Sequence, residues 1–420
     1  MKNIDIKKII IILVVLIGGY FIYSFFFGKN EVSSIDKLET FFPFNSEEGS
    51  NYNGESDFTN INNPSSSNLT DLSANSVPVL RQITNTPVAG VIIFKVVASS
   101  TAPQEESAEK TNQIIRYIEK ATGHIYETST NSPTQTRISN TTIPKIQETL
   151  WLDKESLIIR YLDDNNIIKT FSANLRENEL GDKQLEGIFL PDDIQSLISF
   201  NNGIFYLLEN GQGSLGVISD KNNENKKIIF ESPLKEWLIR EIDDRYINFT
   251  TKPETIIPGY SFLLDTKTGS FNKVIGDKKN LSTLTSNLFN ILYSEYDKSG
   301  LKLSIYNNKE KISSEISLGT FPEKCVWDKE NIYIYCGVPL EKPSQSDLIN
   351  WYKGKVSFSD DVWRINTETN NLEYLVSPME FEEGEIDIIN PILNEENNYL
   401  VFMNKKDYSL WGLKLRKNLF

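Results

Sequence analysis

Short apolar runs of β type recur along the chain, each just after a polar turn. The six runs are residues 157–161, 204–208, 246–250, 291–295, 332–336 and 399–403. Successive runs start 47, 42, 45, 41 and 67 residues apart. They are rich in β-branched and aromatic residues, which favour strands. A period of about 40–50 residues in a strand-rich chain predicts a β-propeller, in which each repeat is a four-stranded antiparallel blade.

The clearest repeat predicts the four strands of one blade, at 238–242, 246–250, 260–264 and 271–275. We name the strands of a blade a to d, from the centre of the ring outward. The predicted c–d turn, 265–269, begins with Asp265 and ends with Gly269, residue types that favour turns. Related turns at 119–123 and 366–370 support the repeat independently of hydrophobicity.

Seven blades are expected, although six or eight are alternatives. Their ranges are 88–130, 138–190, 194–232, 236–277, 281–319, 323–378 and 386–416. The last range has no room for an outer strand. We expect the strand at 79–84 to supply it and close the ring, which removes an open edge.

The N-terminus predicts a membrane anchor. Residues 9–27, from Ile9 to Phe27, carry no charge and are long enough to span a bilayer. Lysines precede the run, so residues 1–8 are expected in the cytoplasm and the propeller outside, in a single-pass protein of the cell membrane. A cleaved signal peptide is the alternative, and the aromatic end of the run, without small residues, argues against it.

Residues 28–77 are rich in Ser, Asn, Glu and Gly and predict a disordered stalk before a propeller at 78–420. One apolar island, Phe41 to Phe44, interrupts the stalk. It is either a docking motif or a membrane-surface contact. The full fold expectation is an all-β chain of about seven blades, preceded by one transmembrane helix and a flexible stalk.

Several segments are similar to known propellers. The repeat and its turns resemble TolB-type and WD-repeat-like propellers, although the Trp-Asp signature does not occur. Nearly the whole chain resembles uncharacterised membrane-anchored propeller proteins of candidate-phylum bacteria, through segments 80–83, 87–90, 116–127, 324–327, 335–339, 351–354 and 360–363. This resemblance implies a fold and a topology but no activity.

The residues offer little catalytic chemistry. The single histidine, His124, is placed in or beside a c–d turn, and one histidine cannot build a multi-histidine metal site. Phosphate-loop, zinc and nucleophile-elbow motifs do not occur. We therefore expect no catalytic residues, no metal and no cofactor. The net charge of −14 argues against a nucleic-acid partner.

Two cysteines, Cys325 and Cys336, fall on strands a and b of one predicted hairpin. If Trp327 lies opposite Ile334, the cysteines lie opposite each other, at a separation that permits a disulfide. An extracytoplasmic location would allow it to form. Two buried thiols are the alternative.

Long connections are the best pointer to function. Residues 98–112, 251–259 and 337–360 exceed what a hairpin needs, and as predicted b–c connections they would share one face. The largest contains Trp351 and Tyr352, which either bind a partner or pack locally. We add Asp360 and Asp361 as candidate binding residues, although paired acids at turns usually cap backbone amides and calcium ligation is a further alternative.

These observations predict a membrane-tethered extracytoplasmic binding or scaffold module for a protein, peptide or glycan. The alternative is an extracytoplasmic hydrolase or lyase that uses carboxylates at the channel mouth. The missing nucleophile and base favour binding over catalysis.

Overall fold

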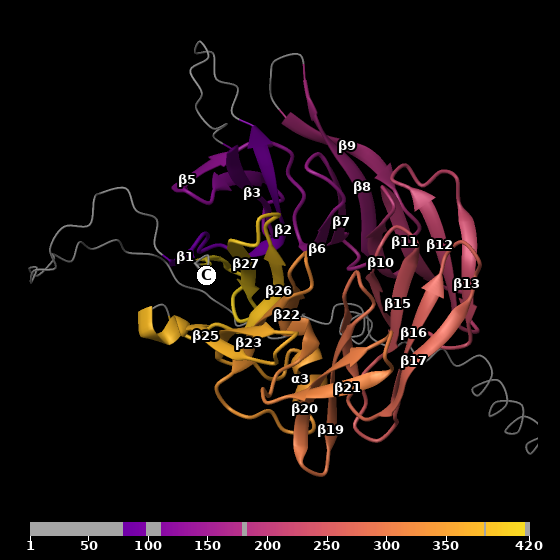
Figure 1. Cartoon of the computed structure of the whole chain (residues 1–420). Coiled ribbons are helices and arrows are strands. Elements are labelled where there is room, and N and C mark those ends of the chain that lie inside the picture. Colours follow the sequence, from indigo (N-terminus) through magenta and orange to yellow (C-terminus); the bar gives the residue numbers. More distant parts are fainter. Residues whose placement is uncertain (1–78, 98–110, 179–182, 382–383, 416–420) are drawn as a thin grey trace, which may run out of the picture. The chain divides into compact units, whose positions relative to one another are not determined.

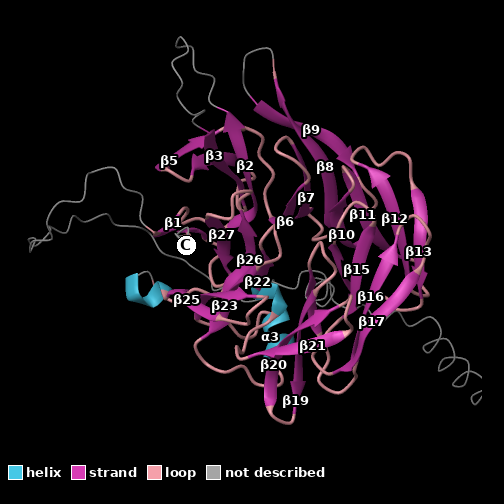
Figure 2. Cartoon of the chain, in the orientation of Figure 1, coloured by secondary structure: helices cyan, strands magenta, loops and turns pink. Residues whose placement is uncertain are grey.

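The computed structural model describes residues 79–97, 111–178, 183–381 and 384–415 (Figure 1). These residues form seven four-stranded antiparallel sheets. Strands dominate the described chain, and its helices are short (Figure 2). The predicted all-β fold with seven blades is confirmed.

Six blades use four strands that are consecutive in sequence. Blade 1 is β2 (Val88–Val97), β3 (Thr111–Glu119), β4 (Ile125–Ser129) and β5 (Ser132–Arg137). Blade 2 is β6 (Ile146–Trp151), β7 (Ser156–Leu162), β8 (Ile168–Glu177) and β9 (Lys183–Phe189). Blade 3 is β10 (Ile194–Phe200), β11 (Gly203–Glu209), β12 (Ser214–Asp220) and β13 (Lys227–Ser232).

The next three blades follow the same order. Blade 4 is β14 (Trp237–Glu241), β15 (Tyr246–Thr251), β16 (Gly259–Asp265) and β17 (Phe271–Lys278). Blade 5 is β18 (Ser282–Thr285), β19 (Ile291–Asp297), β20 (Gly300–Asn307) and β21 (Ile312–Ile316). Blade 6 is η1 (Pro322–Lys324), β22 (Cys325–Trp327), β23 (Tyr333–Pro339), α3 (Asp347–Tyr352), β24 (Asp360–Asn366) and β25 (Leu372–Val376), with η2 (Pro378–Phe381) after it.

The recurring apolar runs are all strand b. They fall in β7, β11, β15, β19, β23 and, in blade 7, β27 (Tyr399–Asn404). Strand b pairs with strands on both sides and packs on both faces against neighbouring blades, so its residues are buried in succession. A continuous apolar run between turns is the pattern of such a strand.

The ring closes as the sequence predicts. Blade 7 is β26 (Ile388–Leu393), β27 and β28 (Leu410–Lys414), with β1 (Leu80–Gln82) added as its outer strand. Arg81 in β1 reinforces this closure, because its guanidinium donates to the carbonyl oxygens of Ser129 and Ser132 in blade 1 and to the hydroxyl of Tyr399. First strands of neighbouring blades pack together, including β26 against β2 across the closure.

One prediction for blade 1 is wrong. β2 is a single strand that pairs along its length with β3, from Val97 opposite Thr111 to Val88 opposite Glu119. Residues 98–110 therefore join strands a and b, not b and c. The turn at 119–123 joins b to c, so His124 lies beside a b–c turn.

The predicted N-terminal segments, 1–8, 9–27 and 28–77, lie outside the described residues, as do residues 98–110 of the first long connection. Within the described ranges, none of the helices has the length and apolar character needed to cross a membrane.

Candidate functional site: the insertion face

The strand order gives each blade two distinct ends. In an antiparallel blade the b–c and d–a connections lie at one end, and the a–b and c–d connections lie at the other. The connections 252–258 of blade 4 and 340–359 of blade 6 are both of the b–c type. We call their end of the ring the insertion face. The connection 98–110 belongs to the opposite face, which corrects the expectation that all three share one.

The blade 6 insertion, residues 340–359, reaches across blade 5 to blade 4. Asn280, in the connection between blades 4 and 5, donates its side-chain amide to the carbonyl oxygen of Gln345. The Gln345 side chain donates to the carbonyl oxygen of Thr255 in the blade 4 connection, at 3.3 Å. The two insertions of this face are thus joined to each other.

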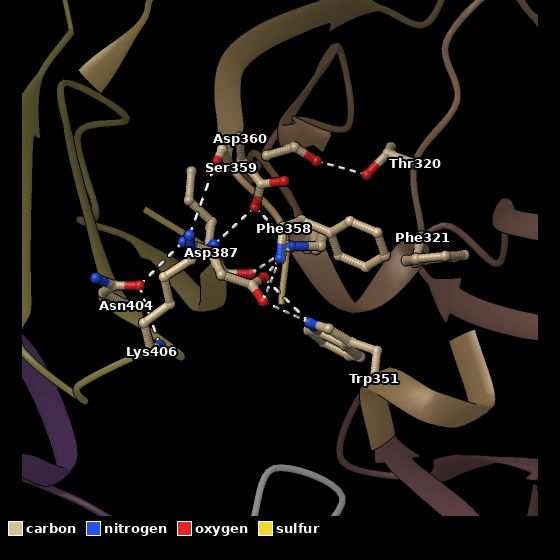
Figure 3. Close-up of polar contacts among 12 residues, drawn as sticks. Thr320, Phe321, Trp351, Phe358, Ser359, Asp360, Asp387, Asn404 and Lys406 are labelled. Carbon is tan, nitrogen blue, oxygen red and sulfur yellow. Dashed lines mark hydrogen bonds and ion pairs between the residues drawn. The ribbon is translucent and has the colours of Figure 1, made fainter. Parts of the chain in front are cut away.

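Trp351 and Tyr352, at the end of α3, are buried, with 0% and 5% of their surface exposed. The Trp351 indole N–H donates to the two carboxylate oxygens of Asp387, at 3.1 and 2.9 Å (Figure 3). The Tyr352 hydroxyl donates to Glu323. Both side chains are therefore engaged in local packing, the alternative that the sequence left open.

A buried ionic cluster lies beneath this helix. The Lys324 ammonium donates to Asp360, at 2.6 Å, and to Asp387, and all three side chains are fully buried. Figure 3 shows the two carboxylates, Asp360 and Asp387. The Ile388 backbone N–H donates to Asp360 at 2.7 Å and that of Phe358 to Asp387 at 3.0 Å. The cluster joins the start of blade 6, its insertion and the start of blade 7.

Burial sets the electrostatics of the cluster. Desolvation, reinforced by the charge of Asp387 and opposed by Lys324, raises the pKa of Asp360 to about 6. Lys405, in the b–c turn of blade 7, is also buried, and desolvation lowers its pKa to about 8 although Asp387 opposes this shift. Its ammonium lies 5.5 Å from the Trp351 ring. Two lysines thus face two carboxylates, so the cluster can be neutral without binding an ion.

Asp361 does not join this cluster. It follows Asp360 in β24, and successive residues of a strand point to opposite sides of the sheet. Asp361 acts electrostatically on Tyr374 in the outer strand instead. The structure separates the two acids that the sequence placed together.

The cysteine hairpin has the expected register. Trp327 lies opposite Ile334, Cys325 lies opposite Cys336, and the two sulfur atoms are joined in a disulfide. Among the described residues there is no group of three or more His, Cys, Asp or Glu side chains that could hold a metal ion. His124 contacts Thr142, with 3.3 Å between Nε2 and Oγ1.

The sequence reasoning missed the exposed apolar side chains of the insertion face. Ile256 and Ile257, at the tip of the blade 4 connection, are 80% and 67% exposed. Their signal in the sequence is an adjacent apolar pair within a loop bounded by Pro253 and Pro258. The sequence analysis favoured the blade 6 insertion because it contains Trp351 and Tyr352, but both of these side chains are buried.

Comparison with known proteins adds fold similarity only. The sequence matches no family model, and no curated protein matches it. A search of solved structures finds an oligogalacturonate lyase from Vibrio parahaemolyticus (9% identity, TM-score 0.46, 80% of this chain and 100% of that chain). It also finds TolB from Acinetobacter baumannii (8%, 0.41, 78% and 80%) and YCF48 from Cyanidioschyzon merolae (8%, 0.48, 80% and 99%). Similarities at this level carry no argument about activity.

Proposed function

We propose that the protein is a membrane-tethered propeller outside the cytoplasm that binds a protein, peptide or glycan through its insertion face. The tether is the apolar run 9–27, and the binding surface centres on the blade 4 connection with Ile256 and Ile257. Trp351 and Tyr352 contribute to it by fixing the shape of the neighbouring insertion. Asp360 has the same supporting role through the buried cluster.

The observation that carries the proposal is the uneven distribution of exposed apolar side chains between the two faces. Among the described connections, the insertion face exposes seven large apolar residues, namely Ile167, Leu234, Ile256, Ile257, Leu340, Met379 and Phe381. The opposite face exposes one such residue in its described connections, Leu288. Exposed side chains of connecting loops do not contribute to the core of a propeller, and apolar side chains gathered on one face are typical of interaction surfaces.

Two further features support the proposed location and orientation. The disulfide between Cys325 and Cys336 is of the kind that persists in oxidising compartments. Residues 83–87 connect β1 to β2 at the insertion face, so the chain enters β1 from the opposite face. A tether that arrives there leaves the insertion face open to a partner.

A hydrolase or lyase based on the carboxylates of this region faces a geometric obstacle. The side chains of Asp360 and Asp387 are fully buried and already hold Lys324. A substrate could reach them only after the blade 6 insertion had moved. Binding needs no such movement, because Ile256 and Ile257 are already exposed.

Cross-linking in intact membranes followed by capture of the full-length chain tests the proposal. Replacement of Ile256 and Ile257 by Ser should weaken partner binding at least about fivefold and reduce the recovered partner accordingly, since an apolar contact pair at an interface is worth about 1 kcal/mol or more. The matched control replaces Leu288 and Ile312, which are 63% and 59% exposed outside the insertion face. Equal recovery from both variants, at unchanged melting temperature, would reject this face as the binding surface.

Location is tested separately with spheroplasts. Protease added to intact spheroplasts should digest the propeller while a cytoplasmic marker survives. Protection of the propeller would contradict the proposed topology without bearing on the binding surface itself.

A further inference from the structure

The buried cluster beneath the insertion holds an amine against a carboxyl group, away from water. The Lys324 ammonium lies 2.6 Å from Oδ2 of Asp360, and neither side chain is exposed. Reacting atoms must approach to about 3–3.5 Å, and a nitrogen hydrogen-bonded to a carboxyl oxygen lies near that distance from its carbon. An ion pair of this kind differs from an amide by one molecule of water, and the surroundings decide which form the site supports.

Aromatic rings enclose the pair. The Lys324 nitrogen lies 5.1 Å from the centre of the Trp351 ring and 5.2 Å from that of the Phe358 ring. Figure 3 shows these rings beside the carboxylates of Asp360 and Asp387. Burial of two charges carries a desolvation cost, which a neutral amide does not have. Exclusion of water also removes the reactant that would hydrolyse the amide.

The two oxygens of Asp360 have different surroundings. Oδ2 accepts from Lys324 and, at 2.7 Å, from the Ile388 backbone N–H. Oδ1 is buried and has no hydrogen-bond partner among the described residues. Desolvation raises the pKa of Asp360 to about 6, so this carboxyl group is protonated more readily than an ordinary one. A protonated Oδ1 can leave as water, and the Ile388 N–H polarises the carbonyl that remains.

Asp387 is placed to move the protons. It accepts from the same Lys324 ammonium. Its two oxygens also accept from the Trp351 indole, at 3.1 and 2.9 Å, and one of them accepts from the Phe358 N–H, at 3.0 Å. Both oxygens are thus engaged as acceptors, which distinguishes this carboxylate from Asp360. A carboxylate in contact with an amine is the partner that can take up its protons during attack on a carbonyl.

We propose that Lys324 and Asp360 join through an intramolecular amide bond in the folded propeller, with Asp387 as the catalytic residue. Asp387 accepts a proton from the ammonium and relays it to Oδ1 of Asp360, and the neutral Nζ attacks Cγ. A second proton follows the same route, the Cγ–Oδ1 bond breaks, and Oδ1 leaves as water. One ammonium and one carboxylate become one amide and one water, Asp387 ends unchanged, and no oxidant or further reactant is consumed.

The amide joins the last residue of η1 to the first residue of β24 and so closes the chain around the blade 6 insertion. The two residues are 36 positions apart. A covalent bridge across such a loop restricts the unfolded chain and thereby stabilises the folded one, as a disulfide does. Reductant, which opens the disulfide of this blade, leaves an amide intact. The inference does not depend on the proposed binding function.

Mass spectrometry of the purified full-length protein, denatured and reduced, tests the proposal. The wild type should be lighter than its sequence by one water, and Lys324→Arg should not show this deficit. Trypsin does not cleave after an acylated lysine, so one branched peptide should contain both Lys324 and Asp360. Lys169 and Asp192 are the internal control: they form a pair of the same types at 2.7 Å that is exposed to water, and their peptides should be unlinked.

Asp387→Asn tests the proton transfer, because it keeps both reacting groups. The bridge should be absent from this variant, and a cooperative melting transition shows that the variant is folded; if it does not fold, the mass of the wild type decides. Folded wild type without the water deficit would overturn the proposal and leave the ion pair. A deficit confined to a peptide with Asp360 alone would overturn it in favour of a succinimide. A bridge to Asp387, or a bridge in folded Asp387→Asn, would overturn the assigned roles.

Discussion

The indole of Trp351 donates to both carboxylate oxygens of Asp387, at 3.1 and 2.9 Å. This bond links the insertion of blade 6 to the residue that precedes the first strand of blade 7. The blade 6 insertion is therefore fixed to the start of blade 7 by a buried hydrogen bond to a charged group. The same carboxylate accepts from Lys324, so removal of either donor alters the whole cluster.

Replacement of Trp351 by Ala should therefore destabilise the propeller strongly. The change leaves a large cavity and removes a donor from a buried carboxylate, and comparable substitutions cost about 3–5 kcal/mol. Urea denaturation measures the loss. The control is Lys353→Ala, an exposed position two residues after Trp351. It should change stability by less than about 0.5 kcal/mol. Equal stability of the two variants would show that the insertion is not held as the structure has it.

Lys405 should give the propeller a distinctive dependence on alkaline pH. Its pKa falls from 10.5 to about 8 on folding, so between these values the unfolded chain binds one more proton than the folded protein. The free energy of unfolding should then rise with pH across this window, by an amount of order 3 kcal/mol at most. Below pH 8 both states are protonated and the contribution to the pH slope vanishes.

Lys405→Met isolates this contribution. The difference in unfolding free energy between wild type and variant should grow from pH 8 to pH 10.5, while Lys406→Met, an exposed neighbour, should leave the slope unchanged. Parallel curves for wild type and Lys405→Met would contradict the lowered pKa.

Arg81 should be essential to ring closure. Its guanidinium donates to two carbonyl oxygens of blade 1, at 2.6 and 2.7 Å, and to the Tyr399 hydroxyl in blade 7, at 3.1 Å. Arg81→Ala removes a charged donor from the partly buried carbonyl oxygens of Ser129 and Ser132 and from the buried Tyr399 hydroxyl, at a cost of about 1.5–3 kcal/mol, although Thr128 still donates to Ser132. Arg137→Ala, on an exposed outer strand, is the control.

Removal of β1 extends this test. A chain that begins at Val88 should melt at a lower temperature than one that begins at Ser76, because blade 7 then exposes an unpaired edge. Equal melting temperatures would show that the ring is stable without its closing strand.

The blades can be predicted from the sequence because each strand b leaves a local pattern, a continuous apolar run between two polar turns. Strand b is buried on both faces, so runs such as 204–208 stand out, and the missing outer strand of blade 7 pointed to Leu80 and its neighbours. The prediction for the connection 98–112 of blade 1 is wrong because residues 88–97 form one strand, β2, which is ten residues long. The length of a strand is decided by the ladder it forms, and that ladder cannot be seen in the sequence.

The buried cluster could not be predicted in this way. Lys324 and Asp387 are 63 positions apart and come together only when blades 6 and 7 pack. Trp351 was expected either to bind a partner or to pack locally, since an apolar helix within a loop has no periodicity that says which surface it meets. Burial of such a residue is a tertiary property, and the exposed pair Ile256 and Ile257 shows the converse case.

The disulfide should make the stability of blade 6 depend on reductant. Cys325 and Cys336 are separated by 11 residues, and closing a loop of this length lowers the entropy of the unfolded chain by the equivalent of about 3 kcal/mol. Guanidinium denaturation of the wild type should show this loss of stability when dithiothreitol is added. A Cys325→Ala, Cys336→Ala variant should be less stable than the wild type, and reductant should not change its stability.

The disulfide should also be coupled to the buried cluster, because Cys325 directly follows Lys324. The stability losses from removing the disulfide and from Trp351→Ala should therefore not be additive. Mass spectrometry of protein exported to an oxidising compartment and alkylated under denaturing conditions without reductant provides the independent check. Modification of both thiols in that experiment would show that the bridge does not form there, and it would also remove one support for an extracytoplasmic propeller.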